Sequence, residues 1–324
     1  MRSMHLRRLC AWALIAAAVA AGSAAAQSFP ARTVNLVVPN PPGGSIDIQA
    51  RIYAQKLQEL WGQPVIVDYK PGAGTMLGMD YVAKSAPDGH TLGMVVTPLV
   101  ILPALREKMP YDTLKDLAPV TMTGVSSIMI AASPKLGADN LAQLIAAAKK
   151  QPGKLTYASP GSGSSMHLAA ELLKLEAGIE LLHVPFKGGA QAYPEIMAGR
   201  VDLQLDPTFG IYRYVKAGKM KAIAVTSANR DPGAPEVPTV AETIPGFSVL
   251  SINGIVVSGR TPRDLVQRIN ADFRRLLREP DVAKRLAELG IETVGNSPED
   301  FASFIRSEIE RWTRVAKAAN VKME

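Results

Sequence analysis

The sequence predicts an α/β fold built on mostly parallel sheets, and three observations support this prediction. Short runs of aliphatic and β-branched residues alternate with stretches of helical periodicity. Two predicted strands run into glycine-rich turns, and each turn ends in serine at the start of a predicted helix. The sequence contains no repeat of solenoid length and no low-complexity segment. Alternating strands and helices of this kind form parallel sheets whose faces are covered by helices.

Residues 1–26 have the features of a secretory signal peptide. Three arginines precede an apolar run over residues 9–21, and Ala24-Ala25-Ala26 provides an A-x-A cleavage pattern. We expect cleavage near Ala26 and export to the periplasm. An uncleaved membrane anchor is the alternative, but the apolar run is short for a membrane span. The only cysteine, Cys10, lies in this segment, so the mature protein would contain no disulfide.

Length and charge indicate a globular protein without a nucleic-acid partner. About 300 residues remain after the predicted cleavage, which is enough for two lobes with a substantial core. Loss of the three signal-peptide arginines lowers the formal charge from +7 to +4, because no acidic residue precedes Gln27. No basic run interleaved with aromatic residues occurs, which argues against nucleic-acid binding. The small positive excess suits an anionic ligand.

The strands and helices follow from hydrophobic periodicity. Helical spacing is clearest in the apolar set Ile48, Ile52, Leu57, Leu60 and Trp61. Eight apolar runs have the length and composition of strands, at residues 33–38, 64–67, 91–96, 128–132, 155–158, 181–184, 201–205 and 221–225.

Two helices near the C-terminus carry start patterns. Thr261-Pro262 and Ser297-Pro298 each supply an N-cap residue, a proline for the first helical position and an acid in the first turn. Each start is followed by an apolar stripe that we interpret as core. The stripes consist of Leu265, Ile269, Phe273, Leu276 and Leu277, and of Phe301, Phe304, Ile305, Ile309 and Trp312.

The two glycine-rich turns are the strongest indication of function. Residues 34–47 read V-N-L-V-V-P-N-P-P-G-G-S-I-D, and residues 157–167 read Y-A-S-P-G-S-G-S-S-M-H. The first backbone N–H groups of a helix have no acceptor within the helix and carry partial positive charge, so a carboxylate or phosphate can bind there. In α/β sheets such turns lie at the carboxyl ends of strands, where ligands bind. Two facing turns would clamp an anion, although the glycines could also serve the turns alone.

Enzyme motifs do not fit this sequence. No window satisfies the glycine-x-serine-x-glycine nucleophile elbow, although Ser165 in a hydrolase is the alternative to test by loss of esterase activity in Ser165→Ala. The dinucleotide fingerprint fails because Met166 stands where its third glycine should be, and the P-loop lysine is absent.

The histidines of the mature chain, His90, His167 and His183, lack the spacing of metal ligands. We expect no enzyme activity, cofactor or metal. We interpret His183 as a hydrogen-bonded strand residue, while His167 is a candidate for the anion site.

Several motifs resemble the Bug family of periplasmic substrate-binding receptors of tripartite tricarboxylate transporters. The resemblance runs in order through residues 29–321. The motifs are V-V-P-N-P-P-G-G-S-I-D, K-P-G-A-G, A-P-D-G-H-T-L, Y-A-S-P-G-S-G-S-S-M-H-L, H-V-P-F-K-G, V-P-T-V-A-E and the pair Arg311-Trp312.

The resemblance implies a two-lobed Venus-flytrap receptor that closes over a small organic carboxylate. Residues 27–125 and 248–324 would form a discontinuous lobe I, and residues 126–247 would form lobe II. The expected partners are the membrane permease subunits of such a transporter, to which the receptor would deliver its ligand. Presentation of the ligand to the ectodomain of a sensor kinase is the alternative. The receptor is expected to be a monomer.

The resemblance also implies the residues of the site. Backbone amides, hydroxyls and ordered water from the two turns would hold the carboxylate without an arginine. Asp47 would support its turn. Because a carboxylate pointed inward would repel an anion, we expect Asp47 to hydrogen-bond backbone amides or ordered water, with its charge directed away from the ligand. Thr97 and Asp206 would line the cleft where family members vary with ligand. The turn residues are Gly43, Gly44 and Ser45 on one side, and Ser159, Gly161, Gly163, Ser164, Ser165 and His167 on the other.

Because of three departures from the family pattern, the sequence does not identify which carboxylate the receptor binds. Asn40 stands where many relatives have an aromatic residue, the segment around Ile252 lacks a common tryptophan, and Asp206 is followed by Pro207. A pocket lined by fewer aromatic side chains would admit a more polar acid, but Asn40 could equally lie on the surface. Citrate, dicarboxylates, amino acids, nicotinate-like acids and aromatic acids therefore all remain candidates.

Overall fold

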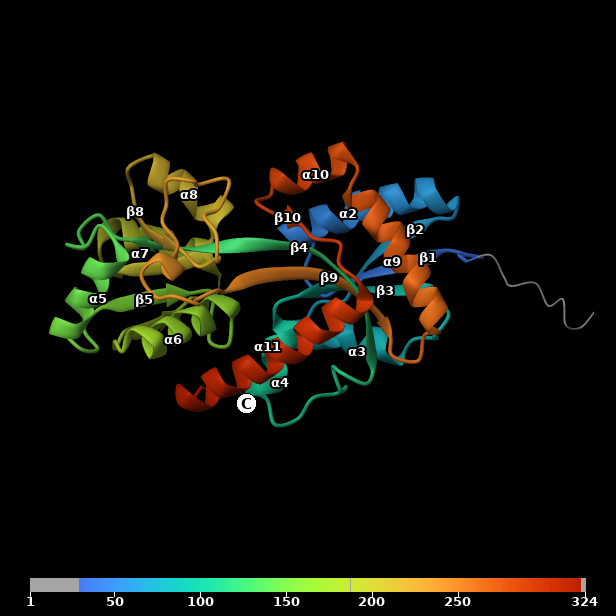
Figure 1. Cartoon of the computed structure of the whole chain (residues 1–324), viewed down its shortest axis with the longest axis horizontal. Helices are drawn as coiled ribbons and strands as arrows, with labels where there is room; N and C mark the ends of the chain where they lie inside the picture. The colour runs from blue at the N-terminus through green and yellow to red at the C-terminus, as the bar shows by residue number, and fades with distance from the viewer. Residues whose placement is uncertain (1–28, 187, 322–324) are drawn as a thin grey trace, which may run out of the picture.

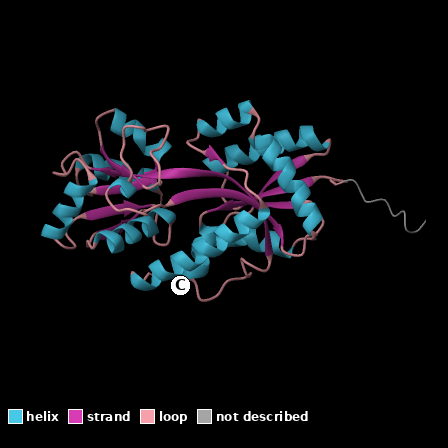
Figure 2. Ribbon diagram, in the orientation of Figure 1, coloured by secondary structure: helices cyan, strands magenta, loops and turns pink. Residues whose placement is uncertain are grey.

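A computed structural model of the chain describes residues 29–186 and 188–321. The predicted signal peptide and Cys10 lie outside the described residues. Two lobes lie side by side and are joined by two long strands (Figure 1). Strands run through the middle of both lobes, and helices cover them on both sides (Figure 2). The predicted two-lobed α/β fold is confirmed.

Lobe I is built on three parallel strands in the order β2-β1-β3. Side chains alternate along the first strand, so that Val34, Leu36 and Val38 face one hydrophobic layer and Val37 faces the other. The first elements of this lobe are β1 (Val34–Val38), α2 (Ser45–Trp61), β2 (Val65–Tyr69), the 3-10 turn η1 (Ala73–Thr75), α3 (Met76–Lys84), β3 (Thr91–Val96) and α4 (Pro98–Leu105).

Lobe II repeats this plan with the parallel strands β7, β5 and β6 side by side. Two hydrophobic layers again lie on opposite faces of the sheet. The elements are α5 (Leu141–Lys150), β5 (Thr156–Ser159), α6 (Ser165–Ala177), β6 (Leu182–Pro185), η2 (Gly189–Ala192), α7 (Tyr193–Ala198), β7 (Leu203–Pro207), α8 (Thr208–Lys216), β8 (Lys221–Val225) and η3 (Val240–Glu242).

Two antiparallel strands, β4 (Leu117–Ala132) and β9 (Leu250–Ser258), pass between the lobes. β4 pairs with β9 up to Ser127, and from Ile128 onward it pairs with β7 and β8 of lobe II. This change of partners lies close to the predicted crossing points near Val125 and Ser248. The lobe boundaries themselves stay a prediction.

The C-terminal elements return to lobe I. α9 (Arg263–Leu277), α10 (Pro280–Ala287) and β10 (Glu292–Thr293) pack on the side of α2, and β10 pairs with β4. The last helix, α11 (Pro298–Ala318), packs against α4 of lobe I and also contacts α6 of lobe II. This helix therefore bridges the two lobes beside the crossing strands (Figure 1).

The eight predicted strands are all present, with shifts of a few residues at their ends. The sequence prediction missed the first part of β4, all of β9 and the short strand β10. The N-cap of α11 is Ser297, as predicted, because its side chain accepts from the N–H of Asp300. The N-cap prediction for α9 was wrong by one residue: Pro262 occupies that position with ψ 139°, and Thr261 precedes it.

Candidate functional site

The lobe I turn joins β1 to α2 and is open to solvent. Gly43 adopts φ 96°, a left-handed conformation that favours glycine. Gly44 is the N-cap of α2 with an ordinary φ of −89°, and Ser45 is the first helical residue. Residues 41–44 are exposed, and Ser45 is half-buried. The turn therefore presents the start of a 17-residue helix at its surface.

Asp47 lies buried behind this turn. Its Oδ2 accepts from the Gly43 N–H at 2.8 Å, and its Oδ1 accepts from the Tyr69 hydroxyl at 2.6 Å and from Arg51 Nε at 2.8 Å. Burial raises the pKa of Asp47, but these hydrogen bonds outweigh burial and lower the pKa overall. The expectation that Asp47 accepts from a backbone amide is confirmed. Asp47 stays ionised, and Arg51 compensates its charge.

The lobe II turn joins β5 to α6 and is more buried than the first. Gly161 and Gly163 adopt φ 130° and 77°. Ser164 is the N-cap of α6, and its hydroxyl accepts from the His167 N–H at 3.2 Å. Ser165 is buried, and its hydroxyl contacts Met166 Sδ rather than a general base. No hydrolase arrangement surrounds Ser165 among the described residues.

Two histidines lie behind the lobe II turn. His167 Nδ1 accepts from the Gly163 N–H at 3.0 Å. His183, on β6, has its Nε2 2.7 Å from Ser159 Oγ, as expected for a hydrogen-bonded strand residue. The two rings stack with their centroids 4.1 Å apart and their planes 12° apart. Ser159 Oγ also accepts from the Gly161 N–H at 3.2 Å, so the pair supports both ends of the turn.

Both turns use the same capping device. In each turn, the glycine before the N-cap residue donates its N–H to the side chain four residues later. The acceptor is Asp47 in lobe I and His167 in lobe II. Gly43, Gly161 and Gly163 therefore use their amides to shape the turns. Among the described residues, six N–H groups in these turns and helix starts have no acceptor. They belong to Gly44, Ser45 and Ile46 in lobe I and to Ser162, Ser165 and Met166 in lobe II.

Thr97 and Asp206 lie at the ends of two further strands. Thr97 is buried, and its Oγ1 accepts from the Ile252 N–H at 3.0 Å, which ties the end of β3 to the crossing strand β9. Asp206, on β7, accepts from the Tyr193 hydroxyl at 2.6 Å. Burial raises the pKa of Asp206 to about 6, and the Tyr193 hydrogen bond lowers it only in part.

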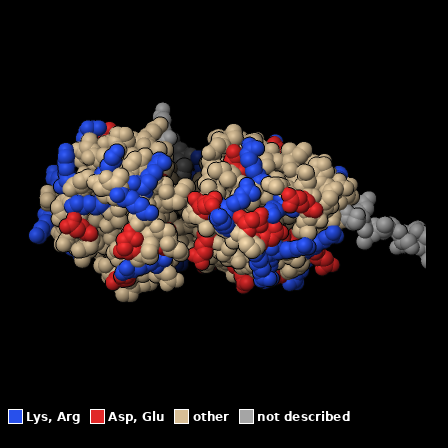
Figure 3. Space-filling model, turned by 90° about the horizontal axis from the view of Figure 1, so that it is seen from above, with Lys and Arg blue, Asp and Glu red and all other residues tan. Residues whose placement is uncertain are grey.

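The strand directions bring the two turns toward each other. β3 is antiparallel to β9 and parallel to β1, so the carboxyl ends of β1 and β3 point toward lobe II. β5 and β7 are parallel, and β7 is antiparallel to β4, so their carboxyl ends point toward lobe I. A groove separates the lobes in the space-filling view (Figure 3). The two turns, and the carboxyl ends of β3 and β7 that carry Thr97 and Asp206, therefore lie at strand ends that point toward the other lobe.

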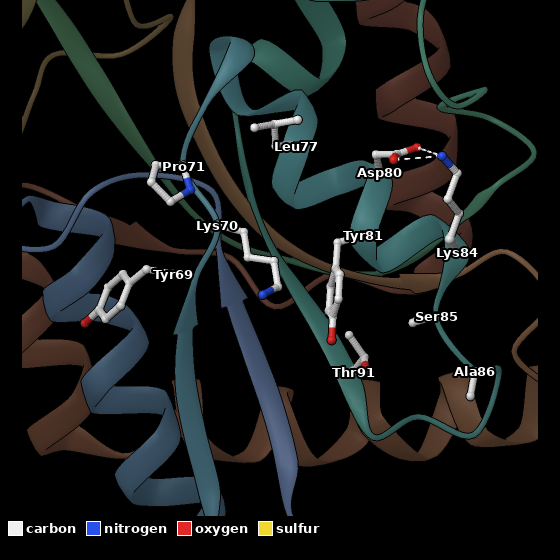
Figure 4. Close-up of a pocket in the computed structure, with 10 residues that line it drawn as sticks. All are labelled: Tyr69, Lys70, Pro71, Leu77, Asp80, Tyr81, Lys84, Ser85, Ala86 and Thr91. Atoms are coloured by element: carbon white, nitrogen blue, oxygen red, sulfur yellow. Dashed lines mark hydrogen bonds and ion pairs between the residues drawn. The ribbon is translucent and has the colours of Figure 1, made fainter.

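A cavity of about 710 Å³ lies elsewhere, on lobe I. Its walls come from the end of β2, from α3 and from the start of β3 (Figure 4). The ammonium group of Lys70 pairs with Asp68 and lies 4.4 Å from the centre of the Tyr81 ring, and Lys84 pairs with Asp80. Both ammonium groups that line the cavity are already neutralised, and no predicted site residue lines it.

Within the described part of the chain, no group of three or more metal-ligating side chains occurs. Over the same residues, no helix has the length and apolar composition of a membrane span.

Comparison with known proteins identifies the family. The family model for the tripartite tricarboxylate transporter family receptor matches residues 49–321. The chain belongs to this family. BugT of Bordetella pertussis is 34% identical over 99% of this chain and 100% of its own length. The UPF0065 protein in the tcbD-tcbE intergenic region of Pseudomonas sp. (strain P51) is 40% identical over 93% of this chain and 91% of its own length.

Solved structures of relatives share the fold. The structure of R. palustris Rpa4515 with adipate has a TM-score of 0.78 and 32% identity, and covers 91% of this chain and 99% of that chain. MatC from Rhodopseudomonas palustris with bound malate has a TM-score of 0.74 and 32% identity, with 89% and 99% coverage. The periplasmic binding protein BugD has a TM-score of 0.75 and 30% identity, with 91% and 100% coverage. This receptor is a binding protein and not an enzyme.

Sequence reasoning missed the residues behind the turns. Arg51 and Tyr69 hold Asp47, and Tyr157 and Glu171 surround the two histidines. The spacing of Arg51, four residues after Asp47 on one helix, could have indicated an ion pair. Tyr69 comes from β2, and no local pattern in the sequence connects it to the lobe I turn. Tyr157 begins the segment of the lobe II turn, but nothing local indicates that its ring lies against His183.

Proposed function

We propose that this receptor binds a small organic carboxylate between its lobes and delivers it to the membrane subunits of a tripartite tricarboxylate transporter. Two amide-rich turns on opposite lobes, pointed toward one groove by the strand directions, carry the proposal. Family membership and relatives with adipate and malate support this ligand class. The mature protein would work in the periplasm after cleavage near Ala26, with residues 27–125 and 248–324 as lobe I and 126–247 as lobe II.

We place the carboxylate at the helix starts of α2 and α6. The positive ends of two helices face the groove, and each contributes backbone N–H groups without an acceptor among the described residues. Both turns need their glycines, because Gly43 and Gly163 have left-handed φ angles. Thr97 and Asp206 would line the side of the pocket. No arginine needs to enter the groove, since the amides and helix ends supply the positive potential.

Ligand screening tests this function. Binding to the native state alone adds RT ln(1 + [L]/Kd) to the free energy of unfolding, about 2.7 kcal/mol at a hundredfold excess over Kd. A thermal-shift screen with malate, adipate, citrate, amino acids and aromatic acids should therefore show a clear rise in melting temperature for at least one acid. If no small carboxylate shifts the transition, the proposed function is wrong.

A substitution at Gly44 tests the location of the site. A Cβ atom added at Gly44 meets no atom within 4 Å, and the φ of Gly44 is ordinary, so Gly44→Leu should fold normally. The added side chain should block the start of α2 and weaken ligand binding by about tenfold or more, or about 1.4 kcal/mol. Gly137→Leu is the matched control, because Gly137 is exposed and also has open space around it. Equal affinities of the two variants in calorimetry would contradict the site.

Uptake experiments test delivery. Cells with the membrane subunits should accumulate the identified acid only when the receptor is present. Binding without uptake, together with a response of a sensor kinase, would favour the sensory alternative.

A further inference from the structure

The capping side chains of the two turns differ in charge. Asp47 is a carboxylate whose charge is compensated by Arg51, at 2.8 Å from Nε. His167 occupies the corresponding third position of its helix and is only 6% exposed. A backbone N–H can be accepted only by an unprotonated ring nitrogen, so the bond from Gly163 places the ring proton on Nε2 and leaves His167 neutral.

The surroundings of His167 keep the imidazole uncharged. Its Nε2 lies 3.9 Å from Glu171 Oε1, but that carboxylate is already bound by the Tyr157 hydroxyl at 2.6 Å and by Lys174 Nζ at 2.9 Å. Burial lowers the pKa of His167, and Glu171 offsets this only in part. Burial also lowers the pKa of the stacked His183, to about 4, and the neighbouring His167 lowers it further. Two stacked rings cannot both become charged without strong repulsion.

The stack also fixes the other end of the turn. His183 contacts Ser159 Oγ, which accepts from the Gly161 N–H, and Tyr157 lies against His183 with ring centroids 4.8 Å apart. The turn is therefore held at Gly161 through His183 and at Gly163 through His167. Both glycine amides are directed inward, which leaves the amides at the start of α6 for an anion.

We infer that His167 and His183 are positioning residues of the lobe II turn, which act as a stacked pair of uncharged imidazoles and do not contact the ligand. Neutrality matters for two reasons. Protonation of Nδ1 would break the Gly163 hydrogen bond, and an ionised acceptor in its place would put negative charge behind the amides that bind the carboxylate. The inference rests on the proposed carboxylate function.

An isosteric pair of variants at His167 tests the charge requirement. The side-chain oxygen of Asn can replace Nδ1 as a neutral acceptor, and Asp has the same shape with a negative charge. We expect His167→Asn to bind the acid identified by screening within about threefold of the wild type. His167→Asp should bind at least about tenfold more weakly, a difference of about 1.4 kcal/mol. Equal affinities of these two variants in calorimetry would overturn the inference.

A second pair of variants tests His183. Phe keeps the stacked ring but has no atom that can bond to Ser159, whereas Gln keeps a polar group near the position of Nε2. His183→Phe should lower the affinity by about fivefold, as expected for one lost hydrogen bond, and His183→Gln should recover most of it. Wild-type affinity in His183→Phe, or no recovery in His183→Gln, would contradict a positioning role.

Nuclear magnetic resonance of the ligand-free wild type provides a readout that needs neither a variant nor a ligand. In uniformly ¹⁵N-labelled protein, a scalar coupling across the hydrogen bond should connect the Gly163 amide nitrogen to His167 Nδ1. The ring nitrogens of His167 should show the neutral Nε2–H form at pH 7. A charged ring, or no coupling, would refute the inference even if the receptor binds a carboxylate. If the protein shows both the coupling and the neutral ring but binds no carboxylate, the proposed function is refuted and the inference about His167 is not.

Discussion

At the scale of single residues, burial and hydrogen-bond donors act in opposite directions on the pKa values of Asp206 and Asp47. Asp206 is 8% exposed, and one hydroxyl donor, Tyr193, does not replace the water that it loses. Asp47 is equally buried but has three donors, and its pKa is lowered. The three hydrogen bonds to Asp47, together with the charge of Arg51, therefore separate two aspartates that look alike in the sequence.

Asp206 predicts a dependence of stability on pH. Its pKa rises from 3.8 to about 6 on folding, so its stabilising effect is complete below pH 3.8 and is lost as the pH rises through about 6. Asp206→Asn keeps an acceptor for the Tyr193 hydroxyl but does not ionise, so it avoids the free-energy cost of a buried negative charge. Between pH 4.5 and pH 7.5, the unfolding free energy of the variant should gain about 1–3 kcal/mol relative to the wild type.

Urea unfolding at the two pH values measures this difference. Glu288→Gln serves as a control, because Glu288 is exposed and should show no comparable change. A difference between Asp206→Asn and the wild type that does not depend on pH would show that Asp206 ionises normally in the native state.

At the scale of elements, the crossing strands are anchored by a few buried hydrogen bonds. Thr97 lies between β3 and α4, and its hydroxyl accepts from Ile252 on β9. Glycine allows close packing beside this region, because a side chain at Gly254 would collide with the Phe301 ring and the Thr121 carbonyl. The position of β9 therefore depends on specific contacts with α4 and α11 as well as on its sheet hydrogen bonds.

Replacement of Thr97 by valine should destabilise this junction. The change keeps the shape but leaves the buried Ile252 N–H without its acceptor, which costs about 1–3 kcal/mol. Thr97→Ser keeps the hydroxyl and loses only a methyl group, so it should cost less. Urea unfolding of both variants measures the effect, and a valine variant as stable as the serine variant would show that the bond is unimportant.

At the scale of the whole molecule, the lobes are connected in a way that permits a hinge. β4 and β9 cross between them, and α11 contacts helices of both lobes. Closure would require β4 and β9 to bend between the lobes and the contact of α11 with α6 to shift, while each lobe stays rigid. Ligand binding at turns on both lobes would then favour the closed arrangement.

Small-angle X-ray scattering should detect this closure. We expect the radius of gyration to fall when the wild type is saturated with its acid, because the groove narrows. Gly44→Leu should show no change at the same ligand concentration. An unchanged radius of gyration in a wild type that binds its ligand would indicate a preformed site without closure.

Much of the fold could be predicted because it depends on local chemistry. Alternating apolar residues, N-cap residues and glycines with forced φ angles act within a few positions of the chain, so the eight strands, the start of α11 and both turns follow from the sequence. Family motifs add the two-lobed architecture. The first part of β4 and β9 escaped prediction because their polar and glycine residues, such as Ser126 and Gly254, interrupt the usual strand pattern.

The tertiary structure decided which groups of the turns remain for a ligand. The sequence identifies Gly163 and His167, but the contacts that use the glycine amide and stack His183 on His167 join β5, β6 and α6. The same holds for Tyr69 beneath Asp47. Hydrogen bonds and ring stacking act only between groups already in contact, and contact between distant parts of the chain is created by packing of the whole sheet.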